Sequence, residues 1–368
     1  MTHNELLLTL PDDPGISIAT LSSVFRHTTN AYKYLWFLAV LECSRRHNHK
    51  KTRLSNEELF NEMLIKALIP SQHFRLSFGP SDKISYLLSN IISENDTTIS
   101  EHSIRNILVE KCFTNEHSDL LRYVRYRLLT PWFSSYLNKS PDQQKNQIIK
   151  DLSISEFESL KPLYLIENTH IEIHEKWLEY FQKNHTIIKG WVTLNWLNFL
   201  QSKNPSVPNI INKLGIPETR GRLTESRKWW SNIISSKNIK CIYSGIILDD
   251  NNFSLDHFIP WTYVAHDEPW NLIPVAIKPN VNSMKGNRLP SHDYLEPFLN
   301  LQSDFIDYYK SNNKIRYSYI TGLRIDEESI NNPEVIKNRL SLEIKNLHSG
   351  ASGLGFISDW KCQLFSPS

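Results

Sequence analysis

The sequence predicts a mainly α-helical protein with one small embedded ββα module, which makes the whole an α+β arrangement. Apolar side chains recur at helical spacing through most of the 368 residues, as amphipathic helices require. Glycine is scarce, at 11 residues, and no G-x-G-x-x-G or Walker pattern occurs, which argues against a dinucleotide-binding sheet. Residues 253–291 are the exception, because two short β-prone runs there are separated by an irregular loop and followed by a helix.

The domain organisation follows from these patterns and from a change in charge along the chain. A chain of this length has ample core for two or three domains. We expect a helical N-terminal domain, a basic connecting segment, the ββα module and a helical C-terminal region that packs on the core. These comprise residues 1–202, 203–240, 241–291 and 292–368.

Composition indicates an ordinary cytoplasmic protein with no membrane segment. Hydrophobic residues make up 40% and charged residues 22%, and the net charge of +2 does not by itself indicate nucleic-acid binding. The cysteines have neither metal-ligand nor disulfide spacing, so we expect reduced thiols; they are Cys43, Cys112, Cys241 and Cys362. We expect no signal peptide, since no basic segment or cleavage site stands at the N-terminus. The longest apolar run, Tyr34–Leu41, is about 8 residues, and a membrane span needs about 20.

The first predicted helix lies at the centre of the N-terminal domain. Thr29 or Asn30 caps it, and it runs to about Cys43 with apolar residues nearly all round, which indicates burial. A basic stretch follows at residues 45–53. This stretch is either a phosphate-binding loop or a solvated cationic helix end favoured by the helix dipole. The second interpretation is the commoner situation for such a run.

Further helices and two short strands complete this domain. Ser55 and Glu58 form a capping box, and the apolar helical spacing that follows extends to Pro70, which should end the helix. We also expect helices at 83–92, 117–129, 141–152, 177–182 and 192–200, and strands at 163–166 and 170–173. No carboxylate or cysteine stands at ligand spacing from the neighbouring histidines, so we interpret them as surface or core residues; they are His170, His174 and His185.

The connecting segment carries a local excess of positive charge. Its cations are opposed only by Glu218 and Glu225; they are Lys203, Lys213, Arg220, Arg222, Arg227, Lys228, Lys237 and Lys240. Phosphate contacts supply most non-specific affinity for nucleic acid, so we expect this segment to hold a phosphate backbone. The candidate contacts are Arg220, Arg222, Arg227 and Lys228, with Arg288 inside the module. Trp229 and Trp230 either stack on bases or pack a helix against the core, and core packing is the commoner role.

The polar residues of the ββα module stand at the ends of its β-prone runs. Asp256 and His257 close the first run, and Asn271 opens the second. The helix that follows contributes Asn280, Asn282 and Lys285, and a Pro290-Ser291 pair ends the module.

These residue types suit metal-assisted hydrolysis of a phosphodiester. Asp256 and Asn282 supply hard oxygen ligands that leave most coordination sites of Mg²⁺ open to water and phosphate oxygens. Such a metal neutralises charge on the phosphate and stabilises the leaving oxygen. A neutral His257 beside it accepts the proton of the attacking water near pH 7. Neighbouring residues in a strand point to opposite faces, so we expect the strand to end or bulge at Asp256 and His257.

The module resembles the HNH, or ββα-metal, endonucleases, and most closely the branch that includes the HNH domain of RNA-guided CRISPR effector nucleases. The match extends from Cys241 to Ser291, and its motif residues are Asp256-His257-Phe258-Ile259-Pro260, Asn271, Asn282-Ser283-Met284-Lys285 and Pro290-Ser291. The resemblance implies that Asp256 and Asn282 bind Mg²⁺ or Mn²⁺ and that His257 is the general base. It also implies that Asn271 braces the loop and orients His257. Lys285 would be a nearby phosphate or structural contact.

One departure from the family pattern concerns zinc. Many HNH domains carry paired C-x-x-C knuckles for a structural zinc ion, whereas Cys241-Ile242-Tyr243-Ser244 holds a single cysteine and no second pair exists. We therefore expect no structural zinc.

The C-terminal region reads as helical. We expect helices at 294–301 and 305–309 and a longer one from Pro333 to about Leu347, capped by Asn332. A loop should follow at 350–355.

Together these observations predict a metal-dependent HNH endonuclease that hydrolyses DNA. The resemblance supplies DNA rather than RNA, a 5′-phosphate product, and a setting in bacterial defence or restriction. Two alternatives stay open: a nucleic-acid-binding or scaffolding module with a vestigial HNH fold, and a subunit whose nuclease is silent without a protein partner. One site cuts one strand at a time, so a double-strand break would suggest a homodimer, although the chain shows no obvious dimerisation helix.

Overall fold

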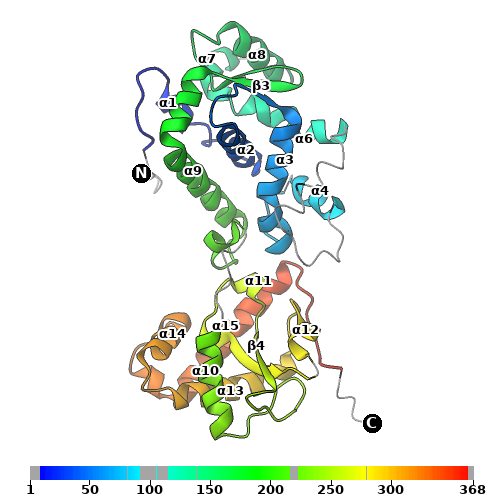
Figure 1. Ribbon diagram of the computed structural model, residues 1–368, viewed down its shortest axis with the longest axis vertical. Coiled ribbons are helices and arrows are strands. Elements are labelled where there is room, and N and C mark those ends of the chain that lie inside the picture. The colour runs from blue at the N-terminus through cyan, green and yellow to red at the C-terminus, as the bar shows by residue number, and fades with distance from the viewer. Residues whose placement is uncertain are drawn as a thin grey trace. The chain divides into compact units, whose positions relative to one another are not determined.

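The computed structural model describes residues 9–80, 82–91, 105, 115–138, 140–215, 223–278 and 280–363. The chain divides into two compact units, whose elements are labelled in Figure 1. The first unit comprises Met1–Pro205 and Leu214–Ile216, and the second comprises Ser206–Lys213 and Pro217–Ser368. Within the described ranges no helix has the length and apolar character that a membrane span requires.

The first unit is built around helix α2, Tyr32–Arg46. Every side chain from Tyr34 to Leu41 is buried, because helices α3 (Asn56–Leu68) and α9 (Glu175–Lys203) pack against α2 (Figure 1). The prediction of a buried central helix is confirmed. Its N-cap is Ala31 rather than Asn30, whose side chain instead accepts a hydrogen bond from the Tyr32 amide at 3.2 Å.

Shorter helices complete the first unit. They are α1 (Ile18–Ser22), α4 (Ile84–Ile91), α6 (Asn115–Arg127), α7 (Ser134–Leu137) and α8 (Asp142–Ser155), with a 3-10 turn η2 at Thr130–Phe133. Helices α4, α6 and α8 agree with the predicted spans to within a few residues, since each has a clear apolar period.

A three-stranded antiparallel sheet also belongs to this unit, in the order β1 (Arg53–Ser55), β3 (His170–Ile173) and β2 (Tyr164–Ile166). Strands β2 and β3 were predicted. Strand β1 was not, because three residues are too few to show an alternating pattern. Its partner residues come from far along the chain, and an ion pair joins Arg53 to Glu172 at 2.9 Å.

Two helix boundaries differ from the prediction. The Ser55 hydroxyl caps α3 by accepting from the Glu58 amide at 3.1 Å, and α3 itself ends at Leu68, just before Pro70, both as predicted, but the helical course of the chain continues. A π-helical turn, η1 (Ile69–His73), follows directly, and Pro70 stands in its first turn, where no amide donor is required. Helix α9 replaces two predicted helices and is kinked at Asn184, whose side chain donates to the Tyr180 carbonyl at 3.2 Å.

The second unit surrounds a two-stranded antiparallel sheet, β4 (Phe253–His257) and β5 (Leu272–Ala276). Its helices are α10 (Thr224–Ser236), α11 (Trp261–Val264), α12 (Val281–Lys285), α13 (Leu295–Tyr308), α14 (Asn313–Leu323) and α15 (Pro333–Gly353). Single 3-10 turns lie at η3 (Ile210–Lys213), η4 (Pro269–Asn271), η5 (His292–Tyr294) and η6 (Ser329–Asn331). Helices α10 and α13 contact β5, and α12 contacts both strands, so every side chain of β5 is buried.

Sequence reasoning missed parts of this unit. The predicted connecting segment contains α10, which buries Trp230, Ile233 and Ile234 beneath its charged residues. Helix α14 was not predicted, and α13 joins two predicted helices. Helix α15 begins at the Asn332 cap as predicted but continues through Gly350, where a loop was expected. Glycine is needed there, because a methyl group would overlap the Tyr263 hydroxyl.

Candidate functional site

The pairing of β4 with β5 fixes the positions of Asp256 and His257. Asp256 stands opposite Ile273 and His257 opposite Leu272 in a regular antiparallel register. Both residues therefore lie within the regular strand, which ends only after His257, and the interruption expected at this pair is not found. Their side chains have different neighbours, as the alternation of a strand requires. Asp256 faces Lys285, whereas the His257 ring faces Asp267.

Lys285 ties the end of β4 to α12. Its Nζ donates to the His257 carbonyl at 2.7 Å and lies 3.1 Å from Oδ2 of Asp256. Both side chains are almost completely buried, at 1% and 6% exposure. Oδ2 of Asp256 nevertheless has no hydrogen bond of good geometry within the described residues, so the contact with Lys285 is a charge pair that leaves acceptor capacity on the carboxylate.

Asp256 also affects a buried tyrosine. Tyr243 is completely enclosed, and burial together with the charge of Asp256 raises the pKa of its hydroxyl well above the usual value. The phenol therefore stays protonated.

Helix α12 brings Asn282 to the same strand. The Asn282 side-chain amide donates to the carbonyl of Leu255, the residue directly before Asp256, at 2.7 Å. The Asn280 side chain caps the helix by accepting from the Ser283 amide at 3.2 Å. Because Asn282 and Lys285 are three residues apart, one face of this short helix presents both to β4.

Asn271 braces the loop after β4. Its completely buried side chain accepts from the Ile259 amide and donates to the Ile259 carbonyl, each at 2.9 Å. The Asn271 carbonyl also accepts from the Phe258 amide at 2.9 Å. These bonds are made to backbone and fix the course of the chain directly after His257.

The His257 ring contacts a carboxylate that sequence reasoning missed. Nε2 of His257 lies 2.8 Å from Oδ1 of Asp267. The ring is 5% exposed and the Asp267 side chain 32%. His266 lies beside the pair, and burial followed by the charge of His257 lowers the pKa of His266 to about 4. Only the presence of an acidic residue in the loop after a candidate base could have suggested Asp267 from sequence.

The donor set fits a hard divalent cation. Asp256 and Asn282 offer a carboxylate with spare acceptor capacity and an amide, which Mg²⁺ accepts while keeping several waters. Across the described part of the chain, no group of three or more His, Cys, Asp or Glu residues is placed to hold a metal. Cys43, Cys241 and Cys362 are buried free thiols, and Cys112 lies outside the described residues.

The predicted phosphate contacts divide into three groups. Arg220 and Arg222 lie outside the described residues. Arg227 donates to the carbonyls of Phe253 and Asp250, and its guanidinium lies over the Phe253 ring at 4.1 Å, so it holds the start of β4. Lys228 is exposed. Arg288 is exposed too, but it donates to the carbonyls of Lys285 and Met284 at the end of α12.

The two adjacent tryptophans have different environments. Trp230 is 1% exposed and packs on Phe305 with ring centroids 4.6 Å apart, which is core packing. Trp229 is half-buried and lines a pocket of about 350 Å³ in the second unit, together with Asp267, Lys314 and Tyr317. Trp229 thus reaches a pocket, where the Lys314 ammonium lies over its ring at 5.6 Å from the centroid, whereas Trp230 belongs to the core.

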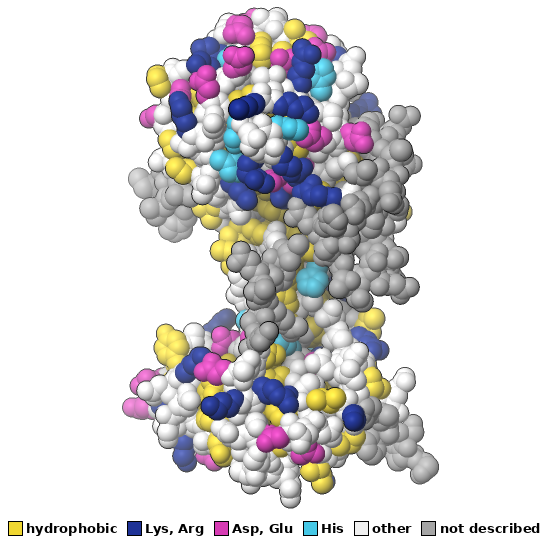
Figure 2. Space-filling model, viewed as in Figure 1, with side chains coloured by type: hydrophobic (Ala, Val, Ile, Leu, Met, Phe, Trp, Pro, Cys, Tyr) yellow, Lys and Arg dark blue, Asp and Glu magenta, His cyan; other side chains and the backbone are white. Residues whose placement is uncertain are grey.

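The basic stretch after α2 is largely paired with acids. Arg45 pairs with Glu42, Arg46 with Glu62, His47 and Lys51 with Glu58, and Arg53 with Glu172. On the face of the first unit seen in Figure 2, Lys and Arg side chains stand among Asp and Glu side chains. These pairs favour the solvated helix end over a phosphate-binding loop.

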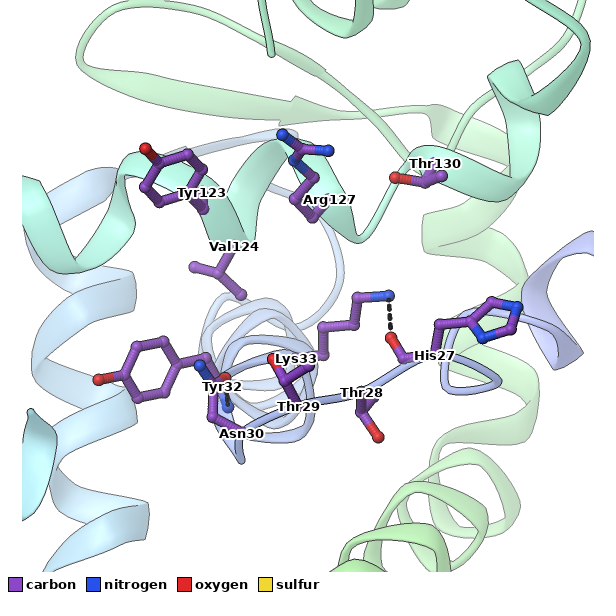
Figure 3. A pocket seen from close by; sticks show the side chains of 10 residues that line it. All are labelled: His27, Thr28, Thr29, Asn30, Tyr32, Lys33, Tyr123, Val124, Arg127 and Thr130. Carbon is purple, nitrogen blue, oxygen red and sulfur yellow. Dashed lines mark hydrogen bonds between the residues drawn. The ribbon is translucent and has the colours of Figure 1, made fainter. Parts of the chain in front are cut away.

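A second pocket, of about 300 Å³, lies in the first unit between the start of α2 and the end of α6 (Figure 3). Its lining includes Lys33 and Arg127. Lys33 donates to the carbonyls of Val24 and His27, and burial followed by the charge of Arg127 lowers the pKa of Lys33 to about 8. Arg127 pairs with Asp142 at 3.0 Å. Among the described residues no carboxylate lines this pocket, so it lacks the ligand type that the β4 site offers.

The fold and the site thus define a mainly helical protein. An antiparallel pair of strands and a short helix in it carry an Asp-His pair and an Asn. Comparison with known families agrees with this description, because residues 241–291 match the family model of the HNH endonucleases. The match identifies this segment as an HNH endonuclease domain, which indicates a nuclease acting on nucleic acid. Neither the curated proteins nor the solved structures compared with the chain give a match.

Proposed function

We propose that the protein is a divalent-metal-dependent endonuclease that hydrolyses phosphodiester bonds of DNA. The observation that carries this proposal is the coincidence of two findings. The segment that matches the HNH endonucleases is also the segment in which β4 and α12 bring Asp256, Asn282 and Lys285 together around the end of one strand. Defence or restriction in a bacterial cytoplasm is the setting in which we place this activity.

The proposal assigns one role to each residue of the site. Asp256 and Asn282 would hold Mg²⁺ or Mn²⁺, which when bound neutralises phosphate charge and supports the leaving oxygen. His257 accepts the proton of the attacking water, a task suited to an imidazole near neutral pH. Asn271 keeps the chain after His257 in place through its two bonds to Ile259. Lys285 fixes the strand end rather than reaching outward, since it is 1% exposed.

The experiment is incubation of the purified protein with supercoiled plasmid and Mg²⁺ or Mn²⁺, run beside His257→Ala. We expect nicking or linearisation by the wild type and none by the variant. His170→Ala, in β3 of the first unit, is the matched control and should cut like the wild type. Equal cutting by wild type and His257→Ala would overturn the proposed role of His257, and no cutting by either would favour a silent or vestigial site.

A second candidate function is a subunit whose nuclease is silent alone. The observation that favours it is the burial of the base, because the His257 side chain is only 5% exposed. A partner or the substrate would then have to open the site. Activity that appears only after addition of a co-purifying protein would support this reading, and full activity of a purified monomer would exclude it.

A further inference from the structure

We propose that Asp267 is a positioning residue for the general base. In this proposal, which rests on the proposed function, Asp267 holds His257 in the tautomer that carries its proton on Nε2. The proton of the attacking water is then taken by Nδ1.

The first argument is the chemistry of the contact. Nε2 of His257 and Oδ1 of Asp267 are 2.8 Å apart, a normal hydrogen-bond distance. A carboxylate only accepts hydrogen bonds, so the imidazole nitrogen must be the donor. A neutral imidazole has one N–H, and placing it on Nε2 leaves the basic lone pair on Nδ1. The hydrogen bond therefore selects which nitrogen acts as base.

The second argument is that the loop holds Asp267 firmly. Ala265 adopts φ +52 at the end of α11 and turns the chain back, and Asn209 donates to the Val264 carbonyl at 2.9 Å just before it. On the other side of Asp267, the Glu268 carboxylate accepts from the Ser318 hydroxyl on α14. The Asn271 amide donates to the Glu268 carbonyl at 3.0 Å. Anchors on both sides give the carboxylate a defined place relative to the ring.

The third argument is burial. Asp267 lines the pocket of about 350 Å³ with its side chain 32% exposed, while the His257 ring behind it is 5% exposed. The carboxylate thus separates Nε2 from the solvent in the pocket. The ionisable groups near the pair are His266 and Lys213 of η3, whose Nζ is held by the carbonyls of Pro208 and Tyr263.

This assignment differs from the role that the family resemblance implied for Asn271. The Asn271 side chain bonds to the backbone of Ile259, whereas the ring of His257 is met by Asp267. Bracing the loop and orienting the base are therefore done by two residues instead of one.

The test is the tautomer of His257, measured by ¹⁵N NMR on full-length protein labelled at histidine nitrogens. Measurements at about pH 9 keep an ordinary imidazole neutral, and the His257→Ala spectrum identifies the His257 signals. We expect a protonated Nε2 and an unprotonated Nδ1 in the wild type, and a mixture of tautomers in Asp267→Ala. Asp304→Asn is the matched control, because it removes a carboxylate elsewhere in the second unit, on α13, where Asp304 pairs with Lys237, and it should keep the wild-type pattern.

Two NMR outcomes would overturn the proposal: a wild-type ring protonated on Nδ1, or an unchanged tautomer in Asp267→Ala. The measurement needs no cutting activity, so it separates failure of this proposal from failure of the proposed function. Where the wild type cuts DNA, Asp267→Ala should lower kcat about 10²–10⁴-fold with KM within about threefold of wild type. Asp267→Glu should recover part of the loss, and a change confined to KM would count against a positioning role.

Discussion

The ammonium group of Lys285 lies 3.1 Å from Oδ2 of Asp256, and both side chains are buried at the point where β4 ends. The same ammonium donates to the carbonyl of His257 at 2.7 Å. One cation on α12 thus holds the backbone of the proposed base and balances the charge of the proposed metal ligand. Lys285 therefore links the stability of this unit to the geometry of the proposed site.

Lys285→Met should destabilise the second unit by about 3–5 kcal/mol, because it leaves the Asp256 charge buried without its partner. The measurement is urea unfolding at neutral pH. Adding Asp256→Asn to the variant should recover part of the loss, since the orphaned charge is then removed. Lys278→Met, at an exposed position after β5, is the control and should change stability little. A loss in Lys278→Met as large as that in Lys285→Met would contradict the role of the buried pair.

Asp256→Ala and Asn282→Ala should each weaken binding of Mn²⁺, measured by titration calorimetry on the full chain. The carboxylate contributes charge as well as an oxygen, so its removal should have the larger effect. Asn251→Ala removes an exposed amide from the turn before β4 and should bind metal like the wild type. Tight binding retained by both Asp256→Ala and Asn282→Ala would place the metal elsewhere.

Charge reversal at Arg220, Arg222 and Lys228 should reduce DNA affinity and flatten its salt dependence. Removal of one bound phosphate from the interface lowers the slope of log affinity against log salt by about 0.9. Fluorescence anisotropy in the His257→Ala background can measure this slope without cutting. Arg227 is left out of this set because its guanidinium holds β4. Reversal at Lys50 and Lys51 in the first unit is the control, and a slope unchanged by the first set would place the DNA-binding surface outside residues 220–228.

Stability of the second unit should rise with pH above neutrality through Lys213. Burial lowers the pKa of this lysine from 10.5 to about 7. Between these values the unfolded chain binds more protons than the folded one, so the free energy of unfolding increases with pH by at most about 1.4 kcal/mol per unit. The increase is complete near the unfolded pKa, and it is absent below pH 7.

Lys213→Met should remove this part of the pH dependence. The measurement is the free energy of unfolding of wild type and variant at pH 7, 8 and 9, compared at each pH. Lys237→Met changes an exposed lysine that also belongs to the second unit, and this variant should retain the pH dependence. Identical slopes for wild type and Lys213→Met would show that the lysine is not deprotonated on folding.

The sequence by itself determined the features that depend on neighbours within about four residues. The apolar run of α2, the Ser55 cap of α3, the Asn332 cap of α15 and the alternation of β3 are local signals, because helix and strand periods and cap bonds span one turn or one strand. The spacing of Asp256, His257, Asn271 and Asn282 likewise pointed to the segment that matches the HNH endonucleases.

Only the tertiary structure decided which side chains meet across longer separations. The pairing of β1 with β3, the use of Arg227 to hold β4, and the contact of His257 with Asp267 join residues whose proximity depends on the packing of several elements. No helical or strand periodicity in the sequence predicts such contacts, because the free energy that brings the partners together comes from burial of the surrounding core. For the same reason the position of Asn282 and Lys285 against β4 depends on the packing of α12 on both strands of the sheet.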